Sequence, residues 1–166
     1  MNRNPTRYNL QVNIQSQIVT VTSNMESEFF RYVSAVPIEK LDWKPSDVGQ
    51  SILSMCREVA VTPEWAMIGM GELEHSEEEA KARYQEVQSW DSVTRCQQEF
   101  DKCFSGWSTY VLRMPDSKLA ETRWLPFNGG RDHTFLEMLE YPRWNITYHL
   151  GQVAYVQTLY GDKEMY

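Results

Sequence analysis

Three polar side chains share one face of a helix that the sequence predicts near the end of the chain. Asn145, His149 and Gln152 are separated by steps of four and three residues, which places them within about 60° of one another on an α-helix. Val156 shares this face, which predicts that the face is buried. A buried polar group without a partner costs about 1 to 3 kcal/mol. Neighbouring helices, water, a metal ion or a ligand must therefore satisfy these side chains.

Two kinds of structure would satisfy such a set. One imidazole and two amides can form an internal hydrogen-bond network. The spacing of four between Asn145 and His149 also lets two side chains of one helix reach a single metal ion. Because any two residues four apart share a helical face, the spacing leaves both interpretations open.

This face belongs to the last of four helical segments that the hydrophobic periodicity predicts. The first segment covers residues 14–36, and the second covers residues 47–70 with Ser46 as its N-cap. Pro63 predicts a kink or a break in the second segment. The third and longest segment covers residues 77–111, and its aromatic stripe is expected to face the core.

The last segment begins at a capping box formed by Thr134 and Glu137. Pro142 predicts that this segment is divided into a short helix and a main helix over residues 143–160. The main helix carries the polar face.

Residues 114–131 interrupt the helical pattern with many turn-forming residues. They predict an irregular insertion before the last helix, with one short extended piece at residues 122–125. Long loops in compact domains often carry function. Together, the four helical segments and the insertion predict an all-α fold, a four-helix bundle that forms a single domain over residues 1–166.

The composition excludes several classes of protein. The chain has 166 residues, with 16 Lys and Arg against 23 Asp and Glu, and a net charge of -7. Without a cluster of basic residues, we expect no nucleic-acid partner. No apolar run is long enough to span a bilayer and the first residues lack a signal-peptide pattern, so we expect no membrane partner and a cytoplasmic location. Three cysteines without CxxC spacing indicate buried thiols.

The segment that carries the polar face resembles a known family. The sequence WNITYHLGQ at residues 144–152, with LYGD at 159–162, is similar to the last helix of the DinB/YfiT-like superfamily, which commonly shows the pattern HxxxHxGQ there. The sequence LDWKP at residues 41–45 looks like the W-x-P entry to that family's second helix. The resemblance implies an up-down-down-up four-helix bundle of DinB/YfiT type, often a homodimer. It also implies a divalent metal ion held by three histidines, one on the second helix and two on the fourth.

Carried over residue by residue, the resemblance implies an altered metal site. His149 matches the second histidine of the last-helix pair, and Asn145 replaces the first. Aligned without gaps from Trp43, Glu58 occupies the position of the histidine on the second helix. Glu58, Asn145 and His149 form a harder donor set than three imidazoles, one that suits Mn, Mg or Ca better than Zn or Ni. We therefore expect a divalent metal, one of Mn, Mg, Zn and Ni, that is weakly held or absent.

Two functional interpretations follow for a pocket that would include Tyr148, Gln152 and Val156. The first is a divalent-metal-dependent transferase or hydrolase that acts on a small molecule, in which the ion polarises a substrate oxygen or activates a thiol or water. The second is a non-catalytic bundle that has lost the metal and either binds a small molecule or serves as a dimeric scaffold. The replacement of a histidine by Asn145 favours the second.

A further hypothesis concerns partner binding through an aromatic surface. The chain has six tryptophans, more than one small core usually needs, and tryptophan is enriched at protein interfaces. We therefore expect some of them at the interface of a homodimer. The candidates are Trp43, Trp65, Trp90, Trp107, Trp124 and Trp144.

Overall fold

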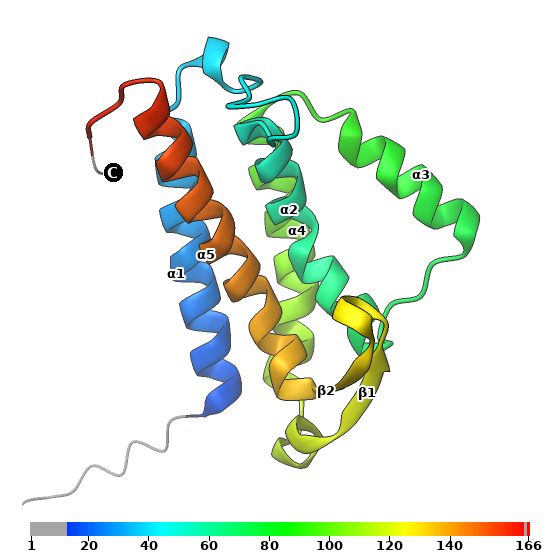
Figure 1. The fold of residues 1–166 in the computed structure, drawn as a ribbon. Helices are drawn as coiled ribbons and strands as arrows, with labels where there is room; N and C mark the ends of the chain where they lie inside the picture. Colours follow the sequence, from blue (N-terminus) through cyan, green and yellow to red (C-terminus); the bar gives the residue numbers. More distant parts are fainter. Residues whose placement is uncertain (1–12, 165) are drawn as a thin grey trace, which may run out of the picture.

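The computed structural model describes residues 13–164 and residue 166. Its four long helices, α1 (Ile14–Ser34), α2 (Ile52–Met70), α4 (Val93–Arg113) and α5 (Phe135–Leu159), form a bundle (Figure 1). Both α1 and α2 pack against α4 and α5. α1 and α5 run in one direction and α2 and α4 in the other, so the up-down-down-up topology expected from the resemblance is confirmed (Figure 1). The predicted domain also includes residues 1–12, which lie outside the described residues.

A separate helix, α3 (Glu77–Gln88), connects α2 to α4. Because α2 and α4 run in the same direction, the chain must return along the bundle between them, and α3 makes this return outside the four-helix core (Figure 1). The prediction of one helix over residues 77–111 is therefore wrong. The break lies between α3 and α4, where the Ser92 side chain caps α4 by accepting a hydrogen bond from the N–H of Arg95.

The start of α2 also differs from the prediction. α2 begins at Ile52, because Ser51 is its N-cap and accepts a hydrogen bond of 3.2 Å from the N–H of Ser54. The predicted cap, Ser46, instead closes a turn in which its carbonyl accepts a hydrogen bond of 3.0 Å from the N–H of Gly49. A short 3-10 helix, η1 (Ile38–Lys40), precedes this turn.

Two prolines lie inside helices without ending them. α2 continues through Pro63, and α5 continues through Pro142, so the predicted division of the last helix is wrong. A proline removes one backbone N–H and costs a helix interior about 3 kcal/mol. Both prolines are buried, and both helices pack against neighbouring helices. This tertiary packing offsets the local cost.

The core consists of two clusters of buried apolar side chains. The aromatic stripe on α4 faces inward as predicted, since Phe100 and Trp107 are buried. Tyr84, an aromatic residue of the predicted segment 77–111, instead lies exposed on α3. The largest fully buried side chains include Phe29, Ile52, Phe100, Trp107, Leu139, Ile146 and His149. Within the described residues, no helix is long and apolar enough to cross a membrane.

The insertion lies between α4 and α5, where the sequence places it. A 3-10 helix, η2 (Asp116–Ala120), precedes an antiparallel hairpin of β1 (Thr122–Leu125) and β2 (Arg131–Thr134), whose turn contains η3 (Phe127–Gly129). The extended piece at residues 122–125 is confirmed as β1. β2 leads directly into the capping box of Thr134 and Glu137 that starts α5. The hairpin is therefore fixed to the first turn of α5, beside the end of α2 (Figure 1).

Candidate functional site

The packing of α2 against α5 brings Glu58, Asn145 and His149 together. Asn145 and His149 lie on the inner face of α5 and are 3% and 1% exposed. Glu58 lies at the edge of the buried face of α2, and its side chain is 45% exposed. The three side chains thus meet where the core opens to the surface between α2 and α5.

The contact between His149 and Glu58 is close but is not aligned as a hydrogen bond. Nε2 of His149 lies 3.0 Å from Oε1 of Glu58. Nε2 is buried, and no hydrogen-bond acceptor among the described residues lies in the direction of its ring N–H. The contact with His149 is the main cause that lowers the pKa of Glu58 to about 2, against the opposing effect of burial. Glu58 is therefore an ionised carboxylate at neutral pH.

Gln152 determines which nitrogen of His149 faces Glu58. Oε1 of Gln152 lies 2.7 Å from Nδ1 of His149. With the amide in this orientation, its oxygen can only accept, so Nδ1 carries a proton. Nε2 then has two states. Without a proton, its lone pair can bind a cation that the Glu58 carboxylate also contacts, and with a proton the ring becomes an imidazolium beside the carboxylate.

Asn145 presents its amide nitrogen to Glu58, not its oxygen. Oδ1 of Asn145 accepts a hydrogen bond of 2.9 Å from the Thr62 hydroxyl. Nδ2 of Asn145 donates to Oε1 of Glu58 at 3.4 Å. Asn145 lies next to the other two predicted ligands, but its oxygen would reach a metal ion only after the amide turns over.

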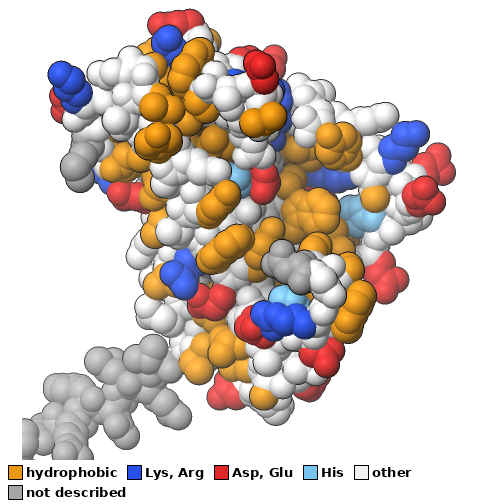
Figure 2. Space-filling model, viewed as in Figure 1, with side chains coloured by type: hydrophobic (Ala, Val, Ile, Leu, Met, Phe, Trp, Pro, Cys, Tyr) orange, Lys and Arg blue, Asp and Glu red, His pale blue; other side chains and the backbone are white. Residues whose placement is uncertain are grey.

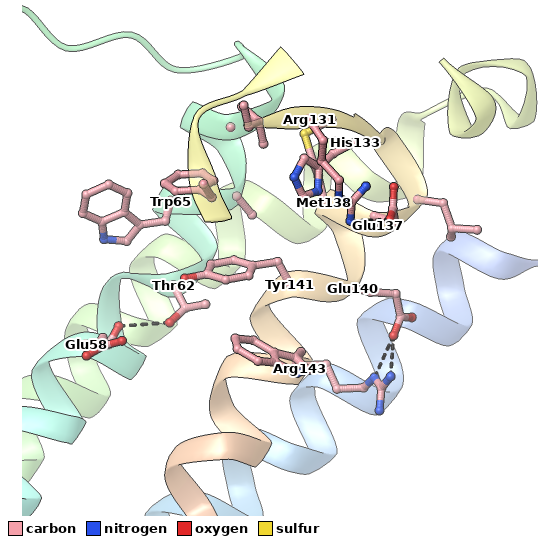
Figure 3. A pocket seen from close by; sticks show the side chains of 16 residues that line it. Glu58, Thr62, Trp65, Arg131, His133, Glu137, Met138, Glu140, Tyr141 and Arg143 are labelled. Atoms are coloured by element: carbon pink, nitrogen blue, oxygen red, sulfur yellow. Dashed lines mark hydrogen bonds and ion pairs between the residues drawn. The ribbon is translucent and has the colours of Figure 1, made fainter. Parts of the chain in front are cut away.

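A cavity of about 930 Å³ opens beside Glu58, bounded by α2, α5 and the hairpin (Figure 3). This volume lies at the upper end of the range typical of small-molecule sites. The residues lining it are Glu58, Thr62, Trp65, Ala66, Gly69, Leu125, Phe127, Arg131, His133, Leu136, Glu137, Met138, Glu140, Tyr141, Arg143 and Trp144.

None of the three residues that the sequence assigned to the pocket lines this cavity. Val156 is 3% exposed and belongs to the core. Tyr148 is exposed and stacks on Trp144, with ring centroids 5.7 Å apart. Gln152 contacts the site through His149. Helical spacing placed these residues correctly on α5 but could not show that the cavity opens toward the start of the helix.

The hairpin contributes cavity residues that the sequence reasoning did not identify. Phe127, Arg131 and His133 come from its turn and second strand. The available signal was the length of the insertion, which suggested function without indicating particular residues. Among the described residues, no group of three His, Cys, Asp or Glu side chains is arranged to hold a metal ion.

Comparison with known proteins supports the fold. No family model matches the sequence, and no curated protein matches it. Among solved structures, the chain is similar to YfiT from Bacillus subtilis, which is described as a probable metal-dependent hydrolase with an unusual four-helix bundle topology. The similarity covers 97% of this chain and 94% of YfiT, with a TM-score of 0.69 and 11% sequence identity. The resemblance found in the sequence is thus confirmed as a shared four-helix fold of YfiT type.

Proposed function

We infer that the protein is a divalent-metal-dependent hydrolase that acts on a small molecule in the cavity between α2, α5 and the hairpin. Glu58 and His149 would hold the ion, with Asn145 as a third donor after its amide turns over. The observation that carries this proposal is the buried Nε2 of His149, which faces the Glu58 carboxylate at 3.0 Å without a hydrogen bond. The description of YfiT as a probable metal-dependent hydrolase supports the same chemistry.

The donors present fit a divalent ion with few protein ligands. A carboxylate oxygen and an imidazole nitrogen point toward the same space, and hydrogen bonding of Nδ1 to Gln152 is the typical arrangement around a metal-binding histidine. Catalytic ions keep open positions, and a harder donor set suits Mn or Mg. When bound, the ion would polarise a substrate oxygen or lower the pKa of a water molecule.

The chain's own residues would position the reacting groups. Gln152 holds the ring of His149, and Thr62 holds Asn145 against α2. Gln50 donates a hydrogen bond of 3.2 Å to Oε2 of Glu58, which leaves Oε1 directed toward His149. The apolar walls of the cavity would exclude water around the substrate.

A second candidate function, a metal-free binding protein, is favoured by the orientation of Asn145. Its amide nitrogen donates to Glu58 as it would in a hydrogen-bond network without metal. A proton on Nε2 of His149 would complete the charge balance of such a network. In this case the cavity binds its ligand without reaction, as a monomer or as a homodimer. Light scattering in solution decides between the two assembly states.

A hydrolysis screen tests the proposed reaction. Protein stripped with chelator and then supplied with Mn²⁺, Mg²⁺ or Zn²⁺ is assayed on chromogenic aryl esters, amides and phosphoesters. We expect turnover that requires the ion and is lost in Glu58→Gln. Glu78→Gln removes an exposed carboxylate from the first turn of α3 and serves as the matched control. Turnover that needs no ion, or that survives Glu58→Gln, would contradict the proposal.

A further inference from the structure

Four large aromatic side chains around the cavity remain exposed. Trp65 is 52% exposed, Phe127 54%, Tyr141 39% and Trp144 58%. They come from α2, the hairpin turn and α5, and hydrophobic side chains gather over this face of the molecule (Figure 2). Aromatic rings contribute large apolar areas when they are buried, and contiguous apolar surface of this kind marks binding sites. The cavity walls therefore indicate a ligand with flat apolar surfaces.

Two of these rings are held in a fixed, nearly parallel arrangement. Tyr141 and Trp144 are three residues apart on α5 and stack with centroids 6.1 Å apart and planes 26° apart. Trp144 in turn stacks on Tyr148 at an interplanar angle of 13°. Because the rings support one another, their faces are ordered before a ligand arrives, which lowers the entropy cost of binding.

The charged side chains that line the cavity are already paired. Arg131 contacts Glu137 at 2.8 Å, and Nε of Arg143 donates to Glu140 at 2.9 Å (Figure 3). The fifth, Glu58, lies beside His149 and accepts hydrogen bonds from Gln50 and Asn145. A charged ligand would have to break one of these pairs or remain uncompensated in an apolar site, which is costly. The charge balance thus favours an uncharged ligand.

One polar atom in the cavity wall has no partner within the described part of the chain. Nε2 of His133, on β2, is buried and makes no hydrogen bond there. Leaving such an atom unsatisfied costs about 1 to 3 kcal/mol. A turn of the His133 ring would bring this nitrogen to the cavity that the residue lines, where a hydroxyl, amine or carbonyl group of a bound ligand would satisfy it.

We propose that the cavity binds an uncharged, flat aromatic molecule that carries one hydrogen-bonding group for His133. If this ligand is the substrate of the enzyme, the inference rests on the proposed function. Binding of the ligand itself does not require the metal ion, so it is tested on chelator-treated protein. Loss of dye binding with metal binding intact would overturn this inference alone. Dye binding by a protein that binds no metal ion would overturn the proposed function alone.

Two fluorescent dyes test the charge and shape of the ligand. N-phenylnaphthylamine is uncharged, and anilinonaphthalene sulfonate has the same rings with one negative charge. We expect the uncharged dye to bind at least about tenfold more tightly. Equal or tighter binding of the sulfonate would show that an unpaired positive charge governs the cavity and would overturn the proposal. A dimer of this chain, found by light scattering, that binds neither dye would also overturn it.

A matched pair of glycine substitutions shows whether the dye occupies this cavity. Gly69 lines the cavity, and a Cβ there would meet Leu125 and Met138 at ordinary contact distances of 3.8 and 3.9 Å. Gly69→Leu should therefore fold, fill part of the cavity and weaken the dye at least about tenfold. Gly106→Leu adds the same side chain to α4, where nothing lies within 4 Å, and should leave binding unchanged. Equal effects of the two variants would place the dye elsewhere and overturn the proposal.

Competition by naphthol and naphthalene against the dye tests the role of His133. The two competitors differ by one hydroxyl group. In the parent protein we expect naphthol to bind more tightly than naphthalene. In His133→Phe we expect the two to bind alike, because the affinity for naphthol alone falls by about fivefold or more. An equal effect of His133→Phe on both competitors would contradict the assignment of a hydrogen-bonding group to this position. Far-ultraviolet circular dichroism checks that the variant is folded.

Discussion

The imidazole of His149 on α5 lies with Nε2 3.0 Å from Oε1 of Glu58 on α2, and the two atoms are not aligned as a hydrogen bond. Gln152 accepts from the other ring nitrogen, so Nε2 is the nitrogen of His149 that can hold either a proton or a cation beside Glu58. The choice between the two separates a metal-dependent enzyme from a metal-free binding protein.

Asn145→His should strengthen metal binding. The substitution puts an imidazole next to Glu58 and His149, where the present amide directs its nitrogen toward Glu58. Because imidazole is a good ligand for Zn²⁺, we expect the affinity for Zn²⁺ to rise by at least about tenfold, measured by competition with a chromogenic chelator. Asn145→Ala is the control, and it should not strengthen binding. An unchanged affinity in Asn145→His would show that the ion does not bind between α2 and α5.

Gln152→Leu should weaken metal binding without removing a ligand. The variant loses the acceptor that lies 2.7 Å from Nδ1 of His149, and such supporting contacts change metal affinity by about 10- to 100-fold. Gln152→Glu retains an acceptor and should restore the affinity. Calorimetric titration with Mn²⁺ measures both variants. Equal affinities for the parent protein and Gln152→Leu would exclude His149 as a ligand.

Glu137→Gln should make stability less dependent on acid pH. The hydrogen bond from Arg131 and the backbone N–H of Thr134 lower the pKa of Glu137 to about 2. A folded-state pKa below the unfolded value means that this stabilisation is present above about pH 4.5 and is lost as the pH falls toward 2. Urea unfolding across this range should therefore give a shallower decline for the variant. Parallel curves for the two proteins would contradict this role.

Helix α3 should open more readily than the bundle. Val87 is the only side chain of α3 that is buried, and Arg83 connects the helix to α2 through Glu64 at 2.7 Å. Hydrogen exchange measured by mass spectrometry should show faster exchange in α3 than in α2, with a further increase in Arg83→Gln and no change in α5. Protection of α3 equal to that of α2 would be inconsistent with the few contacts that hold it.

The sequence predicts those parts of the fold that depend on local periodicity and capping. The predicted first helix begins at Ile14, where α1 does, and the capping box of Thr134 and Glu137 starts α5. The break between α3 and α4 was missed because the hydrophobic pattern continues across it, and Trp90 within the break is buried. The need for a break arises from the topology, since the chain must return along the bundle before α4.

The candidate site could be predicted only in part. The resemblance placed Glu58 and His149 at matching positions, and the structure brings them to within 3.0 Å. The direction of the Asn145 amide depends on Thr62, which is 83 residues away in the chain, so no local pattern reveals it. The aromatic cavity likewise depends on how the hairpin packs beside α2 and α5, which periodicity does not determine.

The metal content of the purified protein shows whether Glu58 and His149 hold a divalent ion. The protein is purified without chelator and without nickel affinity resin, and its metal is measured by mass spectrometry beside His149→Ala and Glu58→Ala. We expect a substantial fraction of one divalent ion per chain in the parent protein and only traces in both variants. Traces in the parent protein, equal to those in the variants, would contradict this expectation.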